Sequence, residues 1–406
     1  MDSLITAAAR ALAVGDPLGA LKRVALREDA PALALRGTAM AQLGDLDRAR
    51  ALLRRAARAF GAREGLFRAR CLLAEAEIAL ASRDLRSASQ SLSSVRMVLE
   101  RFGDRANAIH ARYLEIRRML LVGRLDEAEH ALSNLDPNGS APAVRAVHEL
   151  IVAGIALRRV QAEAASKALA RARAAAEESA IPALTAEVDA VLASLASPAA
   201  RLITHGTARD LKLKDVETLF SSATLVVDAC RFSVRKADRV IELAKRPALF
   251  TLARLLAEAW PNDVPREVLV ARAYRSRHID ETYRARLRVE IGRLRRAIRT
   301  MADVVATPRG FALSPRNARE IAVLARPVDD EHAAVLALLA DGESWSSSAL
   351  SLALGTSPRT VQRALESLAK TGKVEPTGKG RARRWITAPL PGITTSLLLP
   401  APLIYE

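Results

Sequence analysis

The fold is decided by residues 280–313, which read DETYRARLRVEIGRLRRAIRTMADVVATPRGFAL. Apolar residues recur there every three or four positions, a spacing that puts them on one face of an α-helix, namely Tyr283, Leu287, Ile291, Leu294 and Ile298. Arginines occupy the remaining faces. The residues Thr307–Phe311 then predict a basic β-hairpin closed by Pro308, Arg309 and Gly310. This pattern predicts a helix that docks on a core with one face and offers cations on the other.

The segments that precede this helix follow a defined order. The sequence predicts a strand at 239–243, a first helix around 249–256, a turn and second helix at 264–269, and the basic helix at 281–300. In this order the elements resemble the C-terminal DNA-binding domain of the OmpR/PhoB response-regulator family. Residues 289–298 are similar to the family's V-x-I-x-x-L-R-x-x-L recognition helix, and 307–311 to its R-G-x-G-Y turn, shortened. Gly292 departs from the family, which usually has another basic residue there.

The resemblance implies a winged helix-turn-helix domain at 223–316 that reads duplex DNA through its basic helix. Carried over by position, it implies base contacts from Arg286, Arg288, Val289 and Arg293, and a DNA-backbone contact from Arg295. The wing contact would come from Arg309. The DNA-binding set is completed by Arg284 and Arg296. No receiver-like domain precedes this region, so phosphorylation of a built-in receiver is not the expected input.

Net charge agrees with a polyanionic partner. The chain of 406 residues carries +17. Residues 1–200 hold 28 Lys and Arg against 23 Asp and Glu, whereas residues 201–406 hold 34 against 22. A local basic excess attracts phosphate backbones through the release of counterions. A ribosomal or membrane-surface role would fit the same charge, so the charge alone does not choose among them.

The first half of the chain repeats itself. A short turn precedes an alanine at positions 49, 88, 128 and 165, in steps of 39, 40 and 37 residues, and a shorter copy has Ala20. An apolar residue, usually leucine, follows four positions later. Because a helical hairpin cannot bury its apolar face alone, the pattern predicts stacked hairpins over residues 1–197. It resembles tetratricopeptide repeats, which implies binding of a protein, peptide or other effector.

A second winged helix is predicted at 326–388, after a linker at 198–222. Ser357 and Pro358 are a helix cap followed by proline at the first helical position. The order of helices and a basic hairpin resembles winged helices of MarR- and GntR-type regulators. The candidate DNA-binding residues are Arg359, Thr360, Gln362 and Arg363 on the helix, with Lys379, Arg381 and Arg383 on the hairpin. Residues 389–406 form an apolar tail.

Motifs for chemistry are missing from the sequence. It contains no metal-ligand spacing, phosphate-binding loop, dinucleotide fingerprint or nucleophile elbow. We therefore expect no catalytic residue, no metal and no cofactor. With no signal-peptide pattern and no apolar run of bilayer length, a cytoplasmic location at the bacterial nucleoid is expected.

These patterns together predict a mainly α protein with small β wings. Its expected function is that of a homodimeric, DNA-binding transcription regulator, in which the repeats sense a partner and the winged helices bind promoter or operator DNA. The alternative is a protein-interaction scaffold whose winged helices mediate assembly.

Overall fold

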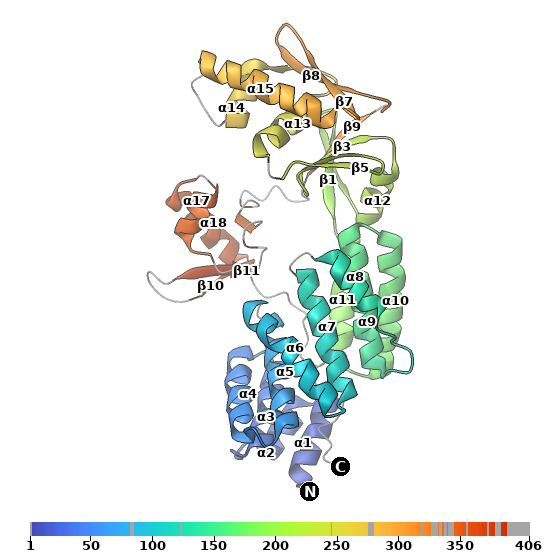
Figure 1. Ribbon diagram of the computed structural model, residues 1–406, viewed down its shortest axis with the longest axis vertical. Helices are drawn as coiled ribbons and strands as arrows, with labels where there is room; N and C mark the ends of the chain where they lie inside the picture. The colour runs from blue at the N-terminus through green and yellow to red at the C-terminus, as the bar shows by residue number, and fades with distance from the viewer. Residues whose placement is uncertain are drawn as a thin grey trace. The chain divides into compact units, whose positions relative to one another are not determined.

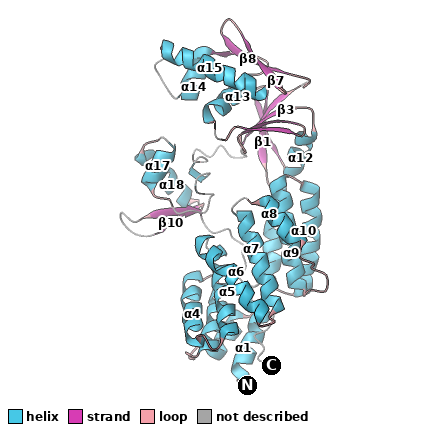
Figure 2. Ribbon diagram, viewed as in Figure 1, coloured by secondary structure: helices cyan, strands magenta, loops and turns pink. Residues whose placement is uncertain are grey.

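The computed structural model describes residues 2–81, 85–121, 124–244, 246–274, 280–318 and 320–325, and parts of 332–387. The chain is mainly helical with small sheets, as the sequence predicts (Figures 1 and 2). It divides into two compact units. One comprises Met1–Arg158, Ala164–Ala193 and Asp330–Glu406, and the other comprises Arg159–Glu163 and Ser194–Asp329.

The N-terminal part is a succession of helices. From α1 to α8, each helix packs against the next one along the chain. The small residues that the repeat pattern singles out are fully buried at Ala20, Ala49, Ala128 and Ala165, whereas the side chain of Ala88 lies outside the described residues. The helices are α1 (Ser3–Ala13), α2 (Pro17–Val24), α3 (Ala30–Gln42), α4 (Leu46–Phe60), α5 (Gly65–Ala81), α6 (Leu85–Arg101), α7 (Arg105–Leu121), α8 (Leu125–Ser133), α9 (Pro142–Arg159), α10 (Ala162–Ser179) and α11 (Pro182–Ala196).

The turn between α3 and α4 shows how small residues let two neighbouring helices approach each other. Gly44 has φ +86°, a left-handed conformation that glycine adopts without strain. Asp45 then caps α4 by accepting a hydrogen bond of 3.2 Å from the Arg48 amide. A Cβ at Gly37 would lie 2.8 Å from Cγ of Leu53. The two helices therefore approach more closely than a larger side chain would allow.

A six-stranded sheet forms one layer of the second unit. Its strand order is β2-β1-β9-β3-β4-β5, in which β3 and β9 are parallel and the other neighbours antiparallel. The helix α12 (Leu213–Ser221) follows β2 along the chain. The strands are β1 (Ala200–Thr204), β2 (Thr207–Leu211), β3 (Leu225–Asp228), β4 (Ser233–Lys236), β5 (Arg239–Glu242) and β9 (Ile321–Ala325).

This sheet corrects the boundaries that the sequence suggests. Residues 198–222, expected to be a linker, instead contain β1, β2 and α12, because Leu202, Leu211 and Val216 are buried in a core shared with β3 and β9. The sheet also continues to Ala325, beyond the expected boundary at residue 316. The strand β9 joins the N-terminal hairpin to the rest of the unit.

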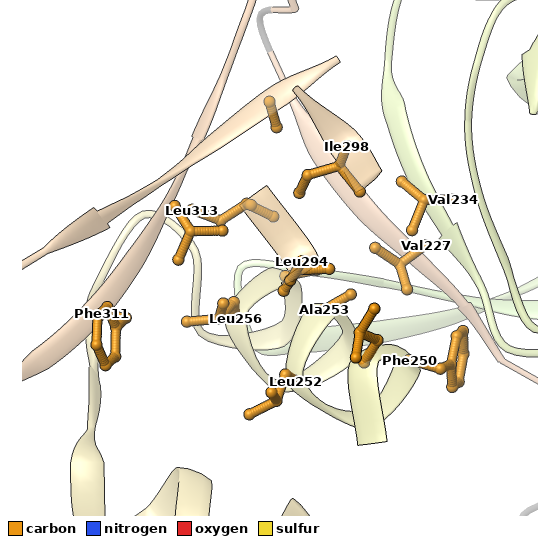
Figure 3. Close-up of a cluster of buried hydrophobic side chains, with 14 of the residues drawn as sticks. Val227, Val234, Phe250, Leu252, Ala253, Leu256, Leu294, Ile298, Phe311 and Leu313 are labelled. Carbon is orange, nitrogen blue, oxygen red and sulfur yellow. The ribbon is translucent and has the colours of Figure 1, made fainter. Parts of the chain in front are cut away.

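The second layer holds the basic helix. α13 (Pro247–Ala259) and α15 (Glu281–Ile298) pack together over the sheet, and α14 (Arg266–Tyr274) contacts both helices. A three-stranded sheet of order β6-β8-β7 completes the layer, from β6 (Val264–Pro265), β7 (Ala302–Ala306) and β8 (Gly310–Pro315). Figure 3 shows the common core, to which α13 contributes Leu252 and Leu256, α15 contributes Leu294 and Ile298, and β8 contributes Phe311 and Leu313.

The C-terminal part has its own small core. It contains α17 (Ser347–Leu354), α18 (Pro358–Lys370) and the antiparallel hairpin β10 (Val374–Thr377) and β11 (Arg384–Thr387). Trp345 pairs with Trp385 of β11 through two backbone hydrogen bonds of 2.9 and 2.8 Å. The core includes Leu350, Val361, Leu365 and Trp385. Residues 326–331, most of residues 333–344 and the apolar tail at 389–406 lie outside the described residues.

Candidate nucleic-acid interface

The basic helix α15 begins where the sequence predicts. The Asp280 side chain accepts a hydrogen bond of 3.0 Å from the Tyr283 amide and so caps the first turn. The predicted apolar stripe is buried at Leu287, Ile291, Leu294 and Ile298, each at most 1% exposed. Tyr283 is half-buried against the ring of Tyr274, with 5.8 Å between the ring centroids. One face of α15 is thus fixed in the core over four turns.

The opposite face of α15 carries the cations. The exposed residues predicted to meet DNA are Arg284, Arg286, Arg288, Val289, Arg293 and Arg296. Their ion-pair partners lie on α15 itself, since Arg284 and Arg288 are each 3.5 Å from Glu281, and Arg293 is 2.7 Å from Glu290. Among the described residues, Arg296 has no ion-pair partner. The two pairs with Glu281 are exposed, and exposed pairs contribute about 0–1 kcal/mol, so an incoming phosphate can replace this carboxylate at little energetic cost.

Arg286 makes a cation–π contact. Its guanidinium lies 4.5 Å from the centroid of the Tyr274 ring. A cation over an aromatic face is attracted by about 0.5–1 kcal/mol at an exposed site. The contact orders the side chain beside the last turn of α14 and leaves it exposed to solvent.

Arg295 is held by the neighbouring hairpin. Its Nε donates a hydrogen bond of 2.6 Å to the carbonyl oxygen of Val304 in β7, and its guanidinium lies 5.9 Å from the Phe311 ring. The side chain is half-buried. Arg295 therefore fixes β7 and β8 against α15, a role that helical spacing did not indicate.

The tip of the hairpin between β7 and β8 is braced by side chains that the sequence did not single out. Arg266 donates hydrogen bonds of 2.8 and 3.0 Å to the carbonyl oxygens of Pro308 and Thr307. The Thr307 hydroxyl donates to Asp263 at 2.6 Å and accepts from the Gly310 amide at 2.8 Å. Their roles depend on the three-dimensional approach of β6 to β8.

Arg309 stands at this braced tip. Its side chain is 73% exposed, and Asp263 lies 4.0 Å away. A Cβ at Gly310 would lie only 1.8 Å from the carbonyl oxygen of Val264, so only glycine permits β6 and β8 to pair here. The hairpin holds Arg309 outward on a rigid support.

The C-terminal candidates are only partly brought together. Ser357 accepts a hydrogen bond of 3.1 Å from the Thr360 amide, and the two hydroxyl groups lie 2.8 Å apart, so Thr360 belongs to the cap of α18. The exposed side chains on this helix include Arg359, Gln362 and Arg363. Arg383 lies 4.5 Å from the Trp385 ring. Lys379 and Arg381 fall outside the described residues.

No group of three or more His, Cys, Asp or Glu residues within the described ranges is placed to hold a metal ion. No described helix is both long enough and apolar enough to cross a membrane. Comparisons of the chain with protein-family models, with curated proteins and with solved structures found no match.

Proposed function

We propose that the chain is a DNA-binding transcription regulator. In this proposal, α13, α14 and α15 with the sheet β6-β8-β7 form a winged helix-turn-helix of OmpR/PhoB type. The exposed face of α15, with Val289 and Arg293, enters the major groove of the DNA, while Arg309 contacts the DNA backbone or the minor groove. Such a protein acts at the nucleoid of a bacterial cell.

One observation carries the proposal. α15 is fixed in the core by four buried residues and yet leaves Arg288, Arg293 and Arg296 exposed. The described ion pairs of these arginines come from α15 itself and not from another element. A docked helix with exposed arginines whose described ion pairs lie within that helix is what attraction to a phosphate backbone requires.

The C-terminal part is proposed to be a second winged helix. The support is a common order of elements in the two parts. In the second unit, β6 is followed by α14, the capped helix α15 and the β7–β8 hairpin, and β6 pairs with that hairpin at Phe311. In the C-terminal part, Trp345 is followed by α17, the capped helix α18 and the β10–β11 hairpin, and Trp345 pairs with that hairpin at Trp385. In this reading Arg359 and Arg363 face the duplex.

The N-terminal helices are proposed to be a tetratricopeptide-like array that binds a protein partner or effector. Support comes from the alanines that are buried at the predicted repeat positions. The competing proposal, an assembly scaffold, is favoured by apolar side chains left exposed on and just after α6, namely those of Met97, Val98 and Phe102. A homodimer is proposed in either case.

Binding of random-sequence duplex DNA at graded salt separates the two proposals. The regulator should bind at low ionic strength, and log K should fall linearly with log salt concentration. A duplex selected from a random pool then tests sequence reading. Arg293→Ala should cost about 1–3 kcal/mol on the selected duplex and less on random DNA. Arg295→Ala should weaken both duplexes alike, because it loosens the hairpin. A wild-type protein that ignores duplexes at low salt would overturn the regulator proposal.

A further inference from the structure

A cleft of about 430 Å³ opens beside α15, on the side away from the hairpin. Its walls are the first turn of α13 and the side chains of Arg246, Glu290, Arg293 and Arg296. Glu290 and Arg295 are five residues apart, or about 140° around a helix. Arg295 contacts β7, so the cleft and the hairpin flank α15 on different sides.

The charges in the cleft do not cancel. Three guanidinium groups line it, and Glu290 supplies one carboxylate, which pairs with Arg293 at 2.7 Å. Arg246 and Arg296 are exposed and have no ion-pair partner among the described residues. Pro247 and Leu249 add apolar wall, which lowers the local dielectric constant and strengthens attraction to an anion. Arg246 makes no side-chain cap for α13, so the nearby amides of Ala248 and Leu249 have no side-chain capping acceptor among the residues that the structure describes.

We propose that this cleft holds a phosphate group of the DNA strand that runs past α15 opposite the hairpin. The inference rests on the proposed function. A major groove is about 12 Å wide and a helix with its side chains is about 10–12 Å across, so a helix in the groove has a sugar-phosphate strand on each side. Arg309 at the hairpin tip is placed for one strand. The cleft is placed for the other, with Arg246 as a phosphate-binding residue outside the basic helix.

The test compares Arg246→Gln with Arg209→Gln in the full chain, on a random-sequence duplex. Arg209 is an exposed arginine of β2, so both variants lose one charge from the same unit. Arg246→Gln should weaken binding several-fold at low salt and reduce the slope of log K against log salt by about 0.9, the value for one phosphate contact. Arg209→Gln should leave both quantities near those of the wild type.

A gain of binding gives a second arm that misfolding cannot imitate. Glu290→Gln removes the carboxylate from the cleft and frees Arg293, so it should tighten binding to random DNA. Unchanged or weaker binding by Glu290→Gln, or an Arg246→Gln slope equal to that of Arg209→Gln, would overturn the cleft as a phosphate site while leaving the proposed function intact. A wild-type protein that fails to bind any duplex would overturn both.

Discussion

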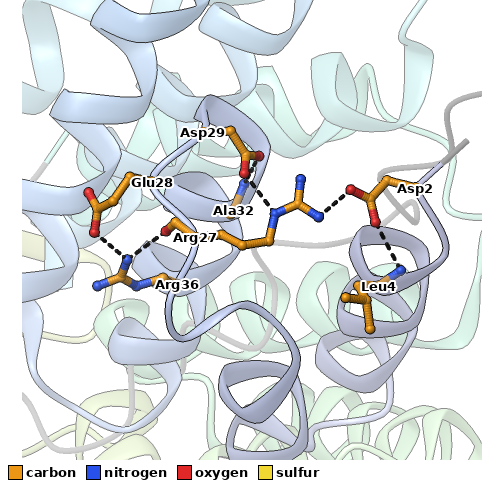
Figure 4. A network of polar contacts seen from close by, with 7 residues as sticks. All are labelled: Asp2, Leu4, Arg27, Glu28, Asp29, Ala32 and Arg36. Atoms are coloured by element: carbon orange, nitrogen blue, oxygen red, sulfur yellow. Dashed lines mark hydrogen bonds and ion pairs between the residues drawn. The ribbon is translucent and has the colours of Figure 1, made fainter.

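Arginine has different uses in the N-terminal helices and in α15. Figure 4 shows Arg27 between Asp2 and Asp29, and Arg36 beside Glu28. The Arg36 guanidinium lies 2.9 Å from the Glu28 carboxylate. Farther along, Arg117 of α7 binds Glu187 of α11, and both side chains are mostly buried. The pairs Arg27–Asp2 and Arg117–Glu187 join segments that are far apart in the sequence. In α15, by contrast, the arginines pair with Glu281 and Glu290 of the same helix and remain exposed.

The difference shows why the number of arginines is a poor guide to their role. Residues 1–200 carry 28 basic and 23 acidic residues, and many of these charges neutralise each other across helix contacts. An arginine becomes a binding group when no carboxylate of a neighbouring element lies within reach. Mutations in the two regions should therefore have different consequences, mainly a loss of stability in the N-terminal helices and mainly a loss of DNA affinity in α15.

The largest expected effect is on stability. Arg117→Ala should destabilise the protein by about 3–5 kcal/mol, because it removes the guanidinium that pairs with the buried carboxylate of Glu187. Arg288→Ala on α15 should change stability by no more than about 0.5 kcal/mol. Urea unfolding of the two variants beside the wild type measures both changes. Equal destabilisation would contradict the distinction, and the double variant Arg117→Met with Glu187→Met should recover much of the loss.

The next effect concerns DNA. The double variant Arg293→Gln with Arg296→Gln should lose about 100-fold in affinity for duplex DNA, on the order of 1.4 kcal/mol for each cation. Its unfolding should match that of the wild type. Arg27→Gln with Arg36→Gln is the matched N-terminal control and should bind DNA normally. Fluorescence anisotropy with a labelled duplex provides the measurement, and a comparable loss in the control would show that charge is acting nonspecifically.

A smaller effect is expected from the C-terminal helix. Arg359→Gln with Arg363→Gln should lower duplex affinity by about tenfold or less, because α18 offers fewer exposed arginines than α15. The salt dependence of binding should become less steep. If affinity and salt slope both stay at their wild-type values, the C-terminal part is not a DNA-contacting winged helix.

The smallest expected effect is on the pH dependence of stability, to which two carboxyl groups should contribute in opposite directions. The hydrogen bond from Arg27 lowers the pKa of Asp29, so the stability this pair contributes is present above the ordinary pKa of 3.8 and is lost as pH falls through the lowered value. Burial raises the pKa of Asp228, whose Oδ2 has no hydrogen-bond partner among the described residues. Its ionisation therefore destabilises the folded state as pH rises from 3.8 through the raised pKa.

Variants separate these two carboxylates. Arg27→Gln should reduce the acid-side loss that comes from Asp29, because the backbone hydrogen bond from Ala32 still lowers its pKa. Asp228→Asn keeps a carbonyl oxygen for the backbone hydrogen bonds from Cys230 and Arg231, and should remove the destabilisation at higher pH. Melting temperatures between pH 3 and pH 7 provide the measurement. Parallel pH profiles for wild type and both variants would refute the assignment.

The sequence predicted elements governed by local rules. The stripe Leu287, Ile291, Leu294 and Ile298 indicated the buried face of α15, and the cap at Ser357 indicated the start of α18. The hairpin at Pro308 to Gly310 also formed as predicted. In each case the deciding interactions lie within a few residues, so periodicity and cap chemistry were sufficient.

Pairings between distant segments were not predictable in this way. β9 reads as an apolar run, but nothing local specifies its parallel pairing with β3 or its antiparallel pairing with β1. The missed strands at 200–211 depend on the same long-range contacts. Arg295 and Arg246 show the same limit for the candidate site, because the roles inferred for them depend on the Val304 carbonyl and on the approach of α13 to α15.

The pairing of β1 with β9 has a mechanical consequence. The strand by which the chain enters the sheet lies beside the strand by which it leaves, with Arg201 opposite Ala325 and Ile203 opposite Val323. Tension applied between the two flanking segments would break the backbone hydrogen bonds of this antiparallel ladder one pair after another, starting at Arg201. The ladder would yield at low force, while the hydrogen bonds between the parallel strands β9 and β3 hold the remainder of the unit closed.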